Sequence, residues 1–93
     1  MAEVSDNANE LRYELRGGDT LIGFINYRDE PDRRVLVHTD IDPKYEGGGY
    51  GSQLVKAALD DVRARGIKIV PLCPFVAAFL RRHPDYGDVV FHG

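Results

Sequence analysis

The sequence predicts a single α+β domain, in which antiparallel strands lead through a loop and a helix to a parallel strand and a short C-terminal helix. Two observations predict this class. Apolar residues alternate with polar ones early in the chain, which is the period of a strand with one buried face. Further on, apolar residues recur at helical spacing between positions 54 and 62. A chain of 93 residues, 43% of them hydrophobic, has room for one small core.

Three strands are predicted before the loop. Residues 11–16 alternate between apolar and charged side chains, and residues 17–19 (Gly-Gly-Asp) supply a hairpin turn. The second strand covers residues 20–27, which are rich in β-branched and aromatic side chains, with Gly23 as a candidate bulge. Residues 35–41 are apolar on both faces until the end of the run, which is typical of a central strand.

The second half of the chain predicts a helix, a strand and a further helix. Gly66 is well placed to end the first helix, because glycine adopts the left-handed conformation at little cost. A fourth strand over residues 67–72 follows directly, and this order implies a right-handed crossover to a parallel neighbour. Residues 75–80 predict a short second helix, and residues 86–91 a final short strand.

Composition limits the partners and the location. With 12 basic and 15 acidic residues, the chain has no electrostatic footprint for nucleic acid or an anionic membrane. No apolar run approaches the ~20 residues that span a bilayer. Residues 1–8 are polar and unpatterned, so we expect a disordered tail followed by a domain over residues 9–93. The single Cys73 and the lack of a signal-peptide pattern predict a cytoplasmic protein. We expect a monomer or a homodimer.

Four glycines within residues 47–51 lie between a predicted strand and the predicted long helix. Such a loop exposes backbone N–H groups at the positive end of a helix dipole, where an anion fits, although the glycines alone are equally consistent with a tight turn. A nucleotide P-loop is excluded because Gly51, rather than lysine, precedes Ser52. A Rossmann fingerprint fails because neither glycine pair is followed by glycine or alanine at the required third position.

Several segments in this order resemble the Gcn5-related N-acetyltransferase (GNAT) superfamily, in particular its small single-domain (YjdJ-type) members. The residues that carry the resemblance are His38-Thr39-Asp40-Ile41, the glycine loop Gly47 to Ser52, Val70-Pro71-Leu72-Cys73-Pro74-Phe75-Val76 and Arg81-Arg82-His83-Pro84-Asp85-Tyr86. The likeness extends over about residues 10–86. It implies a minimal GNAT-like fold, with acetyl-CoA or coenzyme A as the cofactor.

The resemblance also implies where the cofactor binds. Pantetheine is expected in a V-shaped opening between strands 35–41 and 67–73, and the pyrophosphate on the glycine loop. The implied contacts are Asp40, Ile41, Gly47, Gly48, Gly49, Tyr50, Gly51 and Ser52. Phe75 and Phe79 both fit the core, and one of them is a candidate to pack against the cofactor; Phe79 is included in the predicted site.

The charge around the expected phosphates departs from the family pattern. Glu46 stands where the family usually has arginine or glutamine, and we expect its carboxylate to point outward. Lys44, Arg81 and Arg82 are the candidates to balance the phosphate charge, and Arg82 is included in the predicted site.

Two residues are candidates for acyl transfer. Cys73, ahead of a helix N-terminus, is a candidate nucleophile or thiol acid, and His38, at the end of the neighbouring strand, is a candidate general base. Each also fits a purely structural role, the cysteine as packing and the histidine as a hydrogen-bonded strand end. The tyrosine acid of larger relatives is missing, since Leu80 stands roughly at its position. The histidines and Cys73 show no metal-ligand spacing, so no metal is expected.

The first interpretation is therefore an acetyl-CoA-dependent N-acyltransferase that acts on an amine, directly or through Cys73. A short chain has little material for an acceptor pocket, which favours an exposed acceptor such as a protein lysine or N-terminus. A non-catalytic coenzyme A or acyl-CoA binding module is the alternative, and a protein-interaction domain on the same scaffold is a third.

Overall fold

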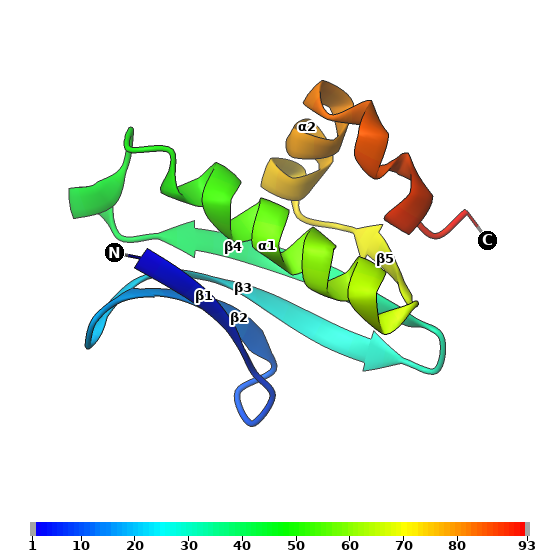
Figure 1. Ribbon diagram of the computed structural model, residues 1–93, viewed down its shortest axis with the longest axis horizontal. Coiled ribbons are helices and arrows are strands. Elements are labelled where there is room, and N and C mark those ends of the chain that lie inside the picture. Colours follow the sequence, from blue (N-terminus) through cyan, green and yellow to red (C-terminus); the bar gives the residue numbers. More distant parts are fainter. Residues whose placement is uncertain (1, 93) are drawn as a thin grey trace.

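The computed structural model describes residues 2–92 and contains one five-stranded sheet in the order β1-β2-β3-β4-β5 (Figure 1). The strands are β1 (Ala2–Asn7), β2 (Arg12–Gly17), β3 (Thr20–Glu30), β4 (Arg33–Ile41) and β5 (Lys68–Pro71). The helices are α1 (Tyr50–Arg65), α2 (Pro74–Arg82) and the 3₁₀ segments η1 (Pro43–Tyr45) and η2 (Pro84–Val89). Neighbouring strands run antiparallel except for β4 and β5, which are parallel. The predicted α+β class is confirmed.

The predicted hairpin between β2 and β3 turns at Gly18, whose φ of +60° lies in the left-handed region. The register of β2 with β3 shifts by one residue beside Gly23, where the sequence predicts a bulge. Gly23 has no room for a side chain, since a Cβ would lie 2.5 Å from Ile41 Cδ1 and 2.6 Å from the Asp40 carbonyl oxygen. This close approach brings β3 against the end of β4.

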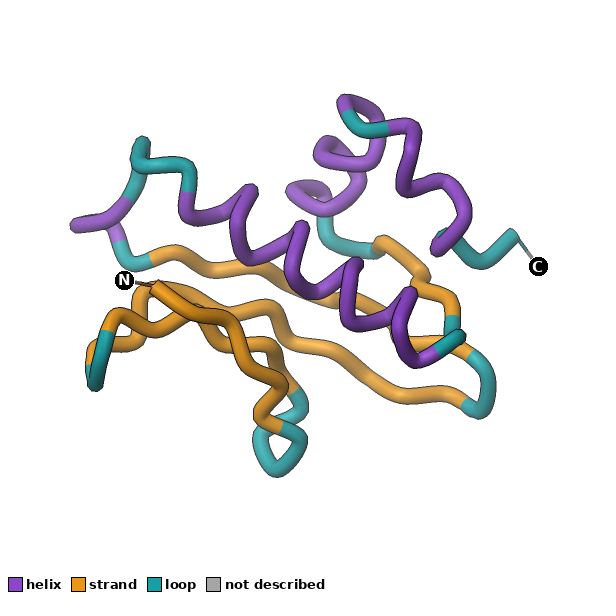
Figure 2. Tube along the Cα trace, in the orientation of Figure 1, coloured by secondary structure: helices purple, strands orange, loops and turns teal. Residues whose placement is uncertain are grey.

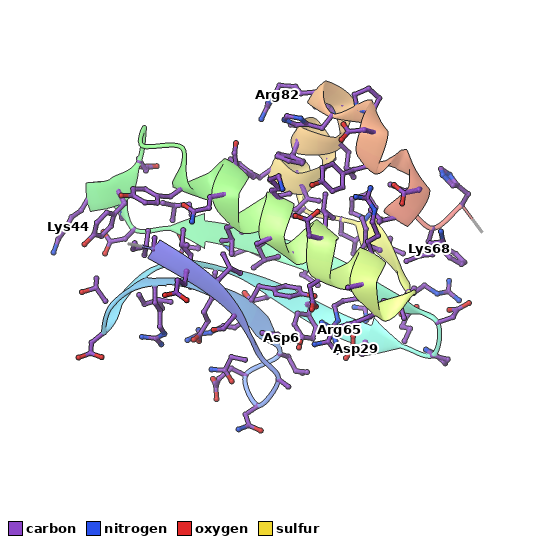
Figure 3. The ribbon with its side chains drawn as sticks, viewed as in Figure 1. Asp6, Asp29, Lys44, Arg65, Lys68 and Arg82 are labelled. Carbon is purple, nitrogen blue, oxygen red and sulfur yellow. The ribbon has the colours of Figure 1, made fainter. Side chains whose placement is uncertain are left out.

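The prediction of a disordered tail over residues 1–8 is wrong for the described part of it. Residues 2–7 form the edge strand β1, which pairs with β2, while Met1 lies outside the described residues. Side chains hold this strand, because the Asp6 carboxylate accepts hydrogen bonds from Tyr27, Arg34 and Arg65. Figure 3 shows Asp6 and Arg65 close together where β1 passes the end of α1. Hydrophobic patterning misses a strand that depends on polar contacts.

The core lies between one face of the sheet and the helices. Helix α1 contributes the predicted apolar face and ends at Gly66, whose φ is +72°. Helix α2 adds Val76 and Phe79 to the same cluster. The buried residues of α1 are Leu54, Val55, Ala58, Leu59 and Val62. Within residues 2–92 no helix contributes to the opposite face of the sheet, because the chain between β1 and β2 is a short turn (Figure 2).

The uncovered face carries a buried carboxylate held by arginines. Glu14 is 3% exposed and accepts hydrogen bonds from Arg12 (2.7 Å), Asn7 (3.1 Å) and Arg16 (3.1 Å). Burial alone raises the pKa of Glu14, but these three hydrogen bonds outweigh it and hold the pKa below its ordinary value. The bare face is therefore stabilised by an ionic cluster where a helix layer is missing.

The C-terminal segment differs from the strand predicted over residues 86–91. Pro84 begins η2, and the buried Tyr86 donates a hydrogen bond to Asp60 on α1 at 2.7 Å. Only Val90 forms an isolated parallel bridge, to Ile69 of β5. The contact with α1 turns this segment into a short helix before it reaches the sheet. No helix over residues 2–92 is long and apolar enough to cross a membrane.

Candidate functional site

The two parallel strands separate after a short paired stretch. β4 pairs with β5 from Arg33 opposite Lys68 to Leu36 opposite Pro71, and the last bond runs from the Cys73 N–H to the Leu36 carbonyl at 3.0 Å. Pro74 then begins α2, which carries the chain away from the sheet (Figure 1). The end of β4 therefore keeps its β3 partner and is open on the β5 side.

A bulge in β4 sets which backbone groups face this opening. β4 has one extra residue, Val37, opposite β3. The Leu36 carbonyl bonds to the β5 side, whereas the Asp42 N–H donates to a β3 carbonyl at 2.8 Å. In a regular strand, the backbone groups of residues 36 and 42, six positions apart, would point to the same side. The bulge therefore reverses the side to which the backbone groups after Val37 point. Thr39 and Ile41 consequently present their N–H and C=O groups to the open side.

A cleft of about 480 Å³ lies in this opening. It runs between the free edge of β4, the glycine loop, the first turn of α1 and α2. The lining residues are Thr39, Asp40, Ile41, Tyr45, Glu46, Gly47, Gly49, Tyr50, Gly51, Ser52, Phe75 and Arg82. Most of the residues predicted to contact a cofactor are thus brought together.

The glycine loop leaves the start of α1 without a protein cap. Gly47 and Gly49 have φ values of +85° and +78°, which favour glycine. Gly49 is the N-cap of α1 and has no side chain to accept hydrogen bonds from the first turn. Since no acidic residue occupies that turn either, its free N–H groups and the helix dipole favour an anion from outside.

Of the two phenylalanines that the sequence offers as candidates, Phe75 forms a wall of the cleft. Its ring lies over Gly51, where a Cβ would come within 2.5 Å of Phe75 Cζ. The side chain is 39% exposed and lines the cleft. Gly51 is therefore needed for the close approach of α2 to α1.

Of the predicted cofactor contacts, Gly48 and Phe79 do not line the cleft. Phe79 is 2% exposed and packs between His83 and Tyr86 in the core. Phe75, one turn earlier on α2, packs over Gly51 and lines the cleft in place of Phe79. Gly48 faces the ring of Tyr50 instead, since a Cβ built on Gly48 would lie 2.9 Å from Tyr50 Cε2.

The charges in the cleft differ in part from expectation. Glu46 is among the residues that line the cleft and is exposed to solvent, so the outward direction of its carboxylate stays a prediction. Of the three candidate cations, Arg82 lines the cleft, whereas Lys44 and Arg81 do not. In Figure 3 Arg82 extends from α2 toward the side of the glycine loop, and Lys44 points away from the molecule at η1. Arg82 is the only basic side chain among the described lining residues.

The two candidates for acyl transfer lie on opposite sides of β4. Cys73 is 3% exposed and belongs to the core, and its Sγ lies 3.1 Å from Thr39 Oγ1. His38 is exposed, and strand alternation puts its side chain on the face opposite to that of Thr39. Neither Cys73 nor His38 lines the cleft, but Thr39 connects the thiol to it. The sequence analysis named Ile41 from the family resemblance, and strand alternation from Ile41 would also have pointed to Thr39, which shares its face.

A buried network anchors the other end of β4. Arg34 is 5% exposed, forms ion pairs with Asp29 (2.7 Å) and Asp6 (3.1 Å), and donates to Tyr13 Oη (2.9 Å). Burial and the hydrogen bond to Asp6 raise the pKa of Tyr27 to about 12. These contacts fix the first half of β4 to β1 and β3, while its second half is left open at the cleft.

A five-stranded sheet with two diverging parallel strands and a glycine loop before α1 defines a class of small α+β domains. Comparison with known proteins makes this class specific. Residues 12–89 match the model of the GCN5-related N-acetyl-transferase family. The chain therefore belongs to this family, as its sequence motifs predict, and family and fold support an acetyltransferase role.

One solved structure shows the same fold over nearly the whole chain. It is the NMR solution structure of a GCN5-like protein from Staphylococcus aureus, with a TM-score of 0.73 and 24% sequence identity. The alignment covers 98% of this chain and 89% of that chain. A search of curated proteins finds no significant match.

Proposed function

We propose that this protein is an acetyl-CoA-dependent N-acyltransferase. The observation that carries the proposal is the free edge of β4, which leads directly into the uncapped start of α1. The pantetheine arm of coenzyme A has two amide groups, which match the free backbone groups of Thr39 and Ile41. Its pyrophosphate matches the N–H groups that follow Gly49.

The residues of the cleft fit this cofactor in shape and in charge. Gly47, Gly49 and Gly51 keep the loop and the first helical turn free of side chains, so phosphates approach the backbone closely. Tyr50, Ser52 and the backbone of Asp40 complete the predicted contacts that line the cleft. Arg82 supplies the positive charge that position 46 lacks, and Phe75 provides an apolar wall.

Acetyl-CoA supplies an activated acetyl thioester, and the chain supplies groups on either side of it. Cys73, reached through Thr39, lies on the helix side and is proposed to protonate the leaving sulfur. His38, on the exposed face, is proposed to take a proton from the incoming amine. Because Cys73 is buried behind Thr39, the geometry favours direct transfer over an acetyl-Cys73 intermediate.

The acceptor is proposed to be an amine on a macromolecule, such as a protein lysine or N-terminus. The cofactor cleft occupies the helix side of the opening, so the acceptor approaches from the uncovered face. There His38 is exposed, and Val37 and Leu72 are 40% and 57% exposed. No helix of the described residues encloses this approach, which suits a large acceptor better than a small one. The unpaired Cys73 favours the cytoplasm as the compartment.

The alternative is a coenzyme A or acyl-CoA binding module without catalysis. It is favoured by the burial of Cys73 and by the presence of Glu46, an acidic residue, among those that line the cleft. This alternative uses the same cofactor contacts, so only turnover separates it from the first proposal.

The test combines binding with turnover. Thermal unfolding is followed with coenzyme A and acetyl-CoA, where a ligand at ~100 times its Kd adds about 2.7 kcal/mol and raises Tm by several degrees. Acetylation of a panel of lysine peptides, protein N-termini and small amines is then followed by mass spectrometry. A shift with peptide acetylation supports the transferase, and a shift without any product supports the binding module. No shift with either ligand contradicts both.

A further inference from the structure

Thr39 forms a contact that the proposed cofactor site does not by itself explain. Its Oγ1 lies 3.1 Å from the sulfur of Cys73, with a hydrogen between them that either atom can donate. Thr39 lines the cleft, whereas Cys73 is 3% exposed and does not. The hydrogen bond from the Cys73 N–H to Leu36 holds the cysteine where β4 and β5 part. Thr39 is therefore the polar contact between the buried thiol and the cleft.

Thr39 lies along the cleft next to the expected position of the acetyl-CoA thioester. This step rests on the proposed function. If the pantetheine amides pair with Ile41 and Thr39, the arm runs from the glycine loop toward Leu36. Its sulfur then follows the second amide, beyond Thr39, where β4 and β5 come together. The Thr39 hydroxyl, which faces the helices, lies between that point and Cys73.

Helix α2 begins directly after Cys73. Cys73 is the N-cap of this nine-residue helix, and its side chain makes no capping hydrogen bond there. A thiolate at an N-cap lies near the free N–H groups of the first turn and the positive end of the helix dipole. Cys73 therefore stands at the end of α2 where the free backbone N–H groups of the first turn are found.

We propose that Thr39 passes the proton of Cys73 to the sulfur that leaves the acyl group. The amine nitrogen forms a bond to the acetyl carbon, and the carbon–sulfur bond breaks with its electron pair on the cofactor sulfur. That sulfur takes the proton of Thr39 Oγ1 while Oγ1 takes the proton of Cys73 Sγ. The amine gives up one proton to His38 and thence to water, and the Cys73 thiolate recovers one from water. No oxidant or reductant is required.

The experiment compares Thr39→Val, which keeps the shape but removes the hydroxyl, with Thr39→Ser, which keeps the hydroxyl. Each is measured with acetyl-CoA and the peptide that the wild type acetylates fastest, beside Cys73→Ala and the double variant. Thr39→Val is expected to lower kcat about 100-fold with little change in KM for acetyl-CoA, which is the usual scale for a lost proton donor. Thr39→Ser is expected to restore most of kcat.

Two further readouts separate a relay from a structural role. Residues that act as a unit are not additive, so Thr39→Val together with Cys73→Ala is expected to lose no more than either alone. Both single variants are also expected to lose the basic limb of the pH profile of kcat. Thermal unfolding checks that each variant folds, and Thr39→Ala replaces Thr39→Val if the valine variant does not.

Each outcome decides the proposal. Unchanged kcat in Thr39→Val, additive losses in the double variant, or a serine variant as slow as the valine variant overturns the relay while leaving the transferase intact. A wild type that binds acetyl-CoA but acetylates no amine instead overturns the proposed function, and the relay with it.

Discussion

The substitution Gly51→Ala tests the packing of α2 on the cofactor loop. A Cβ at this position would lie 2.5 Å from Phe75 Cζ and 3.1 and 3.2 Å from its Cε1 and Cε2. Ordinary contact between carbon atoms begins near ~3.5 Å, so the ring must move by about 1 Å. Phe75 is 39% exposed, and its side chain moves more easily than the backbone. The ring is therefore displaced from its place in the wall of the cleft.

The expected effect is on binding more than on stability. Alanine in a helix gains about 0.5–1 kcal/mol over glycine, which offsets much of the cost of displacing an exposed ring. Loss of an ordered aromatic wall removes on the order of 1–1.5 kcal/mol of apolar contact with the cofactor. This corresponds to roughly tenfold weaker binding of coenzyme A. Isothermal titration calorimetry measures the Kd, and thermal unfolding measures the stability.

Two comparisons decide whether Phe75 is the cause. Gly87→Ala is the matched control, because Gly87 has no heavy atom within 4 Å of its would-be Cβ and does not line the cleft. Its Kd is expected to equal that of the wild type. In a Phe75→Ala background, Gly51→Ala is expected to cause no further loss, since the clash is gone. An equal loss in both backgrounds would refute the argument, because the new methyl group would then obstruct the site by itself.

Three further substitutions probe the loop, its charge and the ionic cluster. Gly49→Ala meets no atoms within 4 Å, but φ is +78°, so backbone strain of about 1–2 kcal/mol is expected to lower Tm by several degrees in thermal unfolding. Arg82→Gln is expected to weaken coenzyme A binding about tenfold at low salt and to reduce its salt dependence in a titration series. The pKa of Glu14 is lowered on folding, so its stabilisation is present above the unfolded value near ~4.3 and is lost as pH falls through the folded pKa. Glu14→Gln is therefore expected to lower the free energy of unfolding by about 1–3 kcal/mol at pH 7. Urea unfolding at a series of pH values is expected to show a smaller loss of stability at acid pH in this variant than in the wild type. An unchanged Tm, an unchanged salt slope or an unchanged acid profile contradicts the respective prediction.

Local patterns were sufficient for most of the fold. The apolar face of α1 and Gly66 predict that helix and its end, and Gly18 predicts the hairpin. The failures have a common physical cause. β1 is held by Asp6, and η2 by the hydrogen bond from Tyr86 to Asp60, and both depend on partners far away in the sequence. Such contacts leave no periodic signal in the strand or helix that they fix.

The candidate site was predictable where the backbone forms it. The glycine loop and the end of β4 follow from residue type and position, because their role does not depend on a side chain. Side-chain roles on α2 were harder to assign. Phe75 and Phe79 are four residues apart, and only the packing of α2 on Gly51 decides which of them lines the cleft. The contact of Thr39 with Cys73 depends on the divergence of β4 and β5.

The most direct test of the central claim is an NMR titration of the ¹⁵N-labelled chain with coenzyme A. Saturable binding of one molecule is expected, with the largest amide shifts at Thr39, Ile41 and residues 47–52. The amides of β1, which the account places outside the site, are expected to change little. Absence of amide shifts up to millimolar coenzyme A would contradict the account, as would shifts confined to the uncovered face of the sheet.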